Sequence, residues 1–149
     1  MTLIPTTLDG WTLEAVRRIL DSGCHEDHRF DWKEMFPHGN DKNAKTRLVE
    51  GAVAMANANG GFLIFGVSDK ERPSCDDGIA GVEQDSRIVG VEQDNEFAAK
   101  LKDQLWRADP PVAHRVLNPP VYVPGTNGRV LYVVQILAKN APHSFNKTF

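Results

Sequence analysis

The sequence has few cysteines, no long apolar run and no excess of basic residues. Cys24 and Cys75 are the two cysteines in 149 residues, and neither lies in a CxxC or zinc-ligand spacing, so a disulfide framework is excluded and reduced thiols are expected. No apolar run approaches the roughly 20 residues of a membrane span, and no signal pattern opens the chain, so we expect a cytoplasmic protein without a membrane partner. The net charge of -3 argues against a protein that coats nucleic acid through a broadly basic surface.

The length and the apolar content indicate one domain. A chain of 149 residues with 41% apolar content can bury a core, so we expect a single domain over residues 1–149, with an N-terminal helix within 1–23. Turn signals and apolar periodicity predict the element order α-β-α-β-β-α-β-β. We interpret this order as an α+β fold in which helices pack on a mixed β-sheet.

The first half of the chain predicts two helices and two strands. The segment TLEAVRRIL predicts a helix capped by Thr7 or Asp9. RFDWKEMF alternates with period 2 and predicts a strand, and the alanine-rich segment from Asn43 predicts a buried helix closed by Gly60 and Gly61. FLIFGV is a continuous apolar run, which is typical of a central strand covered on both faces.

The second half contains a short repeat, a helix and two strands. IAGVEQD at 79–85 recurs as IVGVEQD at 88–94, which we interpret as a duplicated strand and turn without assigned chemistry. NEFAAKLKDQLWR predicts a helix capped by Asn95. HRVLNPPVYV and RVLYVVQILA predict two strands joined by a turn at Asn127 and Gly128, and Pro119 and Pro120 push the first of these strands to a sheet edge.

Asp31 and Lys33 are the first candidates for chemistry. They lie two residues apart on a predicted strand, so both side chains leave the same face. In metal-dependent nucleases a carboxylate holds Mg²⁺ or Mn²⁺ and a lysine stabilises charge on the scissile phosphate. Glu26 at the entrance of the strand and Asp69 just past FLIFGV are candidates to complete the ligand set. These residues predict a phosphodiester-cleaving site.

Structural interpretations of the same residues remain open. On a surface strand, Asp31 and Lys33 can equally form a solvated ion pair that contributes under about 1 kcal/mol to stability. An alternative interpretation of Asp69 is a turn residue without a ligand role. Cys24, His25 and His28 suggest zinc, but no second ligand pair is spaced to complete a tetrahedral site.

A second candidate motif lies between Gly39 and Thr46. It resembles the phosphate loop GxxxxGK[ST], which would imply nucleotide (ATP) binding, but Ala44 replaces the second glycine and its Cβ obstructs the cradle. The alternative is that the cations at this helix start face a polynucleotide backbone. These cations are Lys42, Lys45 and Arg47.

The combined motifs resemble the Schlafen family and its AlbA-like domain, also labelled divergent AAA. The resemblance covers roughly residues 20–145, with a family core at 24–145. Its first part is an acid, four intervening residues, a second acid, an aromatic residue and a lysine. Its second part is a helix ending in Ala-Asn-x-x-Gly-Gly, an apolar strand and Gly-Val-x-Asp. The matching residues are Glu26, Asp31, Trp32, Lys33, Asn57, Gly60, Gly61, Gly66, Val67 and Asp69.

This resemblance implies a metal-dependent endoribonuclease that acts on structured RNA such as tRNA. Its three-carboxylate site would be Glu26, Asp31 and Asp69, and aspartate at 31 is one methylene shorter than the glutamate usual in the family. Other relatives imply a non-catalytic, nucleic-acid-binding or regulatory module. Relatives usually continue into another strand beyond SFNKTF, which implies either a fragment of a longer chain or a sheet completed by a homodimer partner or an additional domain.

Overall fold

The computed structural model describes residues 3–23, 29–37, 39–68 and 87–139. The described helices are the short 3-10 helix η1 (Leu8–Gly10), α1 (Leu13–Asp21), α2 (Lys42–Ala58) and α4 (Phe97–Leu105). The described strands are β1 (Phe30–Lys33), β2 (Gly61–Phe65), β3 (His114–Val116), β4 (Val121–Tyr122) and β5 (Val130–Ile136). None of these helices has both the length and the apolar character needed to cross a membrane.

The strands form one mixed sheet in the order β1-β2-β5-β3, and β4 also pairs with β5. β1 and β2 run parallel, whereas β5 is antiparallel to β2, β3 and β4. Every residue of β2 after Gly61 is buried, as expected for a central strand. The predicted α+β class with a mixed sheet packed by helices is confirmed.

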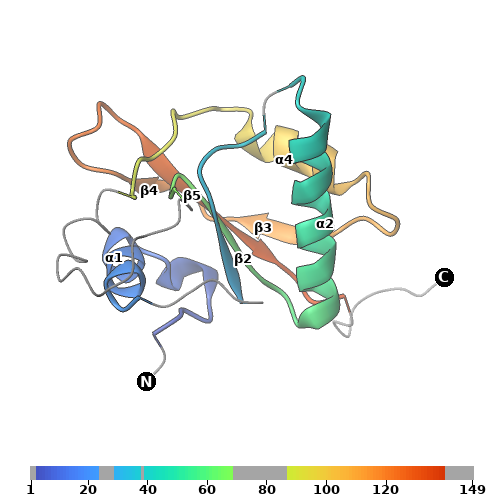
Figure 1. Ribbon diagram of the computed structural model, residues 1–149, viewed down its shortest axis with the longest axis horizontal. Coiled ribbons are helices and arrows are strands. Elements are labelled where there is room, and N and C mark those ends of the chain that lie inside the picture. Colours follow the sequence, from blue (N-terminus) through green and yellow to red (C-terminus); the bar gives the residue numbers. More distant parts are fainter. Residues whose placement is uncertain (1–2, 24–28, 38, 69–86, 140–149) are drawn as a thin grey trace.

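The sheet lies between α1 on one side and α2 and α4 on the other (Figure 1), and a hydrophobic core fills each side. On one face, Phe30 and Trp32 of β1 pack with Trp11 and with the buried side of α1. On the other face, Leu63 and Phe65 of β2 pack with α2 and α4. The aligned register of β1 and β2 explains this division, because residues paired across parallel strands point to the same face.

The helix ends differ in part from the prediction. Thr12 caps α1, since its hydroxyl accepts the N–H of Ala15 at 3.1 Å, so the predicted caps Thr7 and Asp9 are wrong. Asn59 is the left-handed C-cap of α2, with φ of 118°. Gly60 follows with φ of 84°, where a Cβ would lie 2.5 Å from a β5 carbonyl oxygen. Gly61 already begins β2 and is not part of the cap.

The C-terminal strands carry one expected turn and one unexpected break. HRVLNPPVYV divides into β3 and β4 around Pro119 and Pro120, and β3 ends the strand order, as predicted for an edge. Asn127 and Gly128 both have positive φ, at 59° and 89°, in the turn between β4 and β5. The predicted turn is therefore confirmed.

Candidate functional site

Asp31 and Lys33 form an ion pair on β1. Lys33 Nζ lies 3.0 Å from Asp31 Oδ2, and the two side chains retain exposures of 28% and 31% respectively. Their partners in the register are Leu63 and Phe65, which belong to the core beneath α2 and α4. The pair therefore shares one face, as predicted, and this is the α2 and α4 side of the sheet.

The end of β2 is bound to the end of β1. The N–H groups of Gly66 and Val67 both donate to the carbonyl oxygen of Lys33, at 2.7 and 3.2 Å. Ser68 is buried, and its N–H donates to the carbonyl oxygen of Arg87 at 2.8 Å. The residues that follow β2 are thus tied to Lys33 on one side and to Arg87 on the other.

Two of the three predicted metal ligands, Glu26 and Asp69, lie outside the described residues. The same is true of the residues that suggested zinc, which are Cys24, His25 and His28. Among residues 3–23, 29–37, 39–68 and 87–139, no three His, Cys, Asp or Glu side chains cluster so that they could hold a metal ion. Asp31 is the predicted ligand whose surroundings are defined, and its half-exposed carboxylate has the oxygen donors that Mg²⁺ and Mn²⁺ prefer.

The phosphate-loop motif does not form a phosphate cradle at the start of α2. Asp41 is the N-cap of α2, and its carboxylate accepts the N–H of Ala44 at 2.9 Å. Lys45 Nζ donates to the carbonyl oxygen of Gly39 at 2.9 Å. A carboxylate thus occupies the helix end where a P-loop holds phosphate. This geometry disfavours the nucleotide-hydrolysing interpretation of the motif.

Two of the three predicted nucleic-acid-binding cations share a cavity. Lys42 and Lys45 line a space of about 600 Å³ between the start of α2 and the end of α4. Arg47 is exposed but does not line this cavity. At about 100° per residue it lies roughly 140° around the helix from Lys42, which explains why it faces elsewhere.

Two further cavity residues were missed from the sequence. Gln104 and Arg107 approach the cavity from the end of α4. Gln104 is only 4% exposed, although it is polar. It lies beside Leu101 and Leu105 in the apolar stripe of the helix, and a polar residue in such a stripe was the available signal.

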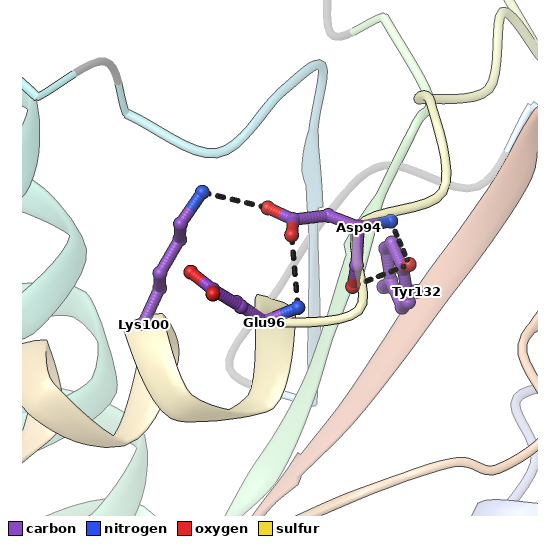
Figure 2. Close-up of polar contacts among 4 residues, drawn as sticks. All are labelled: Asp94, Glu96, Lys100 and Tyr132. Atoms are coloured by element: carbon purple, nitrogen blue, oxygen red, sulfur yellow. Dashed lines mark hydrogen bonds and ion pairs between the residues drawn. The ribbon is translucent and has the colours of Figure 1, made fainter.

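The second copy of the repeat anchors α4 (Figure 2). The N–H of Asp94 donates to the hydroxyl of Tyr132 at 2.8 Å, and Asp94 Oδ1 accepts the N–H of Glu96 at 2.9 Å. Lys100 Nζ lies 2.8 Å from Asp94 Oδ2. The hydrogen bond from Lys100, followed by that from Glu96, lowers the pKa of Asp94, and the same contact raises the pKa of Lys100. This copy has a structural role, while 79–85 lies outside the described residues.

Comparison with known proteins identifies the family. No curated protein matches the chain. The family described as Schlafen, AlbA_2 matches residues 26–149, which is most of the chain. The chain therefore belongs to the Schlafen AlbA_2 family, as its motifs predicted.

Proposed function

We propose that this chain is a Mg²⁺- or Mn²⁺-dependent endoribonuclease that acts on structured RNA such as tRNA. The observation that carries the proposal is the Asp31–Lys33 pair, a carboxylate and an ammonium 3.0 Å apart on one face of β1. Family membership supports a nucleic-acid-related role for the domain.

In this proposal, Asp31 would hold the metal together with Glu26 and Asp69. The sequence pattern supports the inclusion of Glu26 and Asp69, because both acids match the positions that the family motif gives to its carboxylates. A bound divalent ion would supply Lewis-acid polarisation of the phosphate and a more acidic water.

Lys33 would stabilise the negative charge that develops on the scissile phosphate. Its ammonium is already held beside Asp31, so little reorganisation is needed when a phosphate arrives. Its partial exposure leaves it accessible to a ligand as large as RNA.

Incubation of purified protein with end-labelled tRNA and Mn²⁺ tests this proposal. We expect wild type to cleave, and Asp31→Asn to lower the cleavage rate by at least about 100-fold, because the substitution removes an anionic ligand but preserves shape. Glu14→Gln is the matched control, since Glu14 is an exposed acid on α1, across the sheet. Equal cleavage by wild type and Asp31→Asn would show that the activity does not come from this site.

A nucleic-acid-binding module without turnover is the second candidate. The cavity lined by Lys42, Lys45 and Arg107 favours it, because two cations of α2 and one from the turn after α4 converge there. Salt-dependent RNA binding by wild type, without metal-dependent cleavage, would support this candidate over the nuclease.

A further inference from the structure

The cavity between α2 and α4 combines positive charge with polar groups. Its basic residues are Lys42 and Lys45 from α2 and Arg107 from the end of α4, whereas Glu50 is its acidic residue. Lys45 contacts a neutral carbonyl, and Arg107 is only loosely paired with Asp103, at 3.7 Å and with both side chains exposed. Such a surface pair contributes little, so the cations remain available to an anion.

Gln104 supplies an independent sign that the cavity takes a ligand. Its side chain lines the cavity and is 4% exposed, yet Oε1 is buried without a hydrogen-bond partner among the described residues. An unsatisfied buried amide oxygen costs about 1–3 kcal/mol, so it needs either a partner or a reason to lack one. A ligand with a hydrogen-bond donor would provide that partner once the Gln104 side chain turns its buried Oε1 toward the cavity.

We propose that this cavity binds one nucleotide of an RNA strand, an inference that rests on the RNA substrate proposed above. Lys42 contacts the phosphate from the start of α2 and Arg107 from the turn after α4, and the Gln104 amide bonds a hydroxyl or a base group of the nucleoside. The volume of about 600 Å³ lies within the range of roughly 300–1,000 Å³ for small-ligand sites. The positive charge of Lys42 and Arg107 thus matches the phosphate of a nucleotide, and the Gln104 amide matches its nucleoside.

A phosphorylated ribonucleoside reaches the cavity either within an RNA strand or as a free nucleotide such as ATP. The chemistry recognised is the same in both cases. The strand is favoured because the Asp41 carboxylate already accepts the N–H of Ala44 at the start of α2, which leaves no backbone cradle for a triphosphate.

Metal-free binding measurements test the inference. Fluorescence anisotropy with a short labelled oligoribonucleotide in EDTA would compare wild type with the double variant Lys42→Ala/Arg107→Ala and with Gln104→Met. Arg115→Ala is the matched control, because Arg115 is exposed on β3 and pairs with Gln135, which is aligned with Phe62 on the α1 side of the sheet. Unlabelled AMP and ATP serve as competitors, and circular dichroism checks that each variant folds.

We expect the double variant to bind at least about tenfold more weakly and to lower the slope of log affinity against log salt by about 0.7, the value for one neutralised phosphate of a single strand. Gln104→Met should weaken binding about threefold to tenfold, the value of one hydrogen bond. Arg115→Ala should match wild type in both affinity and salt slope.

Equal affinity and slope for wild type and the double variant would overturn the inference, as would an equal loss in Arg115→Ala or no RNA binding by wild type. Displacement of the labelled RNA by ATP at lower concentrations than by the unlabelled oligoribonucleotide would replace the strand with a free nucleotide. EDTA removes metal, so these binding outcomes do not depend on cleavage. If tRNA is not cleaved but RNA binding is intact and depends on the cavity residues, the nuclease proposal is rejected and the proposal for the cavity is retained.

Discussion

Tyr132→Phe tests whether the repeat copy at 88–94 holds α4 in place. The hydroxyl of Tyr132 accepts the N–H of Asp94 at 2.8 Å and donates to the carbonyl oxygen of Asp94 at 3.3 Å. The ring of Tyr132 stacks on Phe97, the first residue of α4, at 4.0 Å between centroids and an interplanar angle of 5°. The substitution keeps this ring contact, so it isolates the hydroxyl.

The expected loss of stability is about 1–2 kcal/mol. Each hydrogen bond contributes about 0.5–1.5 kcal/mol net. The substitution leaves the N–H of Asp94 without its Tyr132 partner, whereas the carbonyl oxygen of Asp94 still accepts the N–H of Phe97 at 3.0 Å. Asp94 is partly exposed, so water replaces part of the loss and the estimate stays below the full cost of a buried unsatisfied group. For a chain of this length, the melting temperature should fall by about 2–8 °C.

Urea unfolding followed by circular dichroism measures this loss. Tyr122→Phe is the matched control, because Tyr122 on β4 is 54% exposed and should change stability by less than about 0.5 kcal/mol. If Tyr132→Phe were as stable as wild type, the Asp94 to Tyr132 contact would not be what fixes the start of α4. Equal losses in both variants would also contradict the reasoning.

Three further substitutions probe the fold. Gly66→Ala should cost at least about 2 kcal/mol of unfolding free energy in urea, because φ is +114° and the new Cβ would lie 2.7 Å from a β5 side chain. Gly39→Ala is the control and should be near neutral, because nothing lies within 4 Å of its new Cβ. Similar losses in the two variants would contradict this. Leu101→Ala should cost about 2–5 kcal/mol because Leu101 is fully buried, whereas Leu3→Ala, at a 41% exposed site, should cost far less; equal costs would refute the packing of α4. Asp94→Asn should flatten the decline of stability below about pH 4, because the lowered pKa of Asp94 gives stability above its unfolded value near 3.8 that is lost as pH falls through the folded pKa. Urea midpoints across acid pH measure this, and an acid decline as steep as in wild type would count against it.

Local sequence patterns predicted which helices and strands form better than they predicted where each helix begins and ends. The apolar stripe of Phe97, Leu101 and Leu105 predicted α4 because helical periodicity is set by neighbours three and four residues apart. The cap of α1 was predicted wrongly because several capping residues precede it: Asp9 lies in η1, and Thr12 is the residue whose hydroxyl reaches the helix. Choosing among them requires the path of the backbone.

The candidate sites show the same limit. Spacing predicted that Asp31 and Lys33 share a face, because alternation along a strand is a local property. Neither spacing nor composition indicated that Gln104 and Arg107 approach Lys42, since that depends on how α2 packs against α4. The sequence disfavoured the phosphate loop because of Ala44, and the structure adds a reason that spacing did not indicate: the Asp41 side chain at this helix end competes for the place of the phosphate.

The packing on the two faces of the sheet limits where RNA can bind. The α1 side is filled by aromatic rings, including Trp11, Phe30 and Trp32, so β1 presents its charges, Asp31 and Lys33, on the other side. The cavity between α2 and α4 lies on that same side. If one RNA molecule binds both at the cavity and at the Asp31–Lys33 pair, substitutions at the two places should change different kinetic constants. Lys42→Ala/Arg107→Ala should raise KM for tRNA cleavage while leaving kcat near wild type, and Asp31→Asn should lower kcat, because the first removes uniform binding and the second removes transition-state stabilisation. A cavity variant that lowers kcat as strongly as Asp31→Asn would contradict this division of roles.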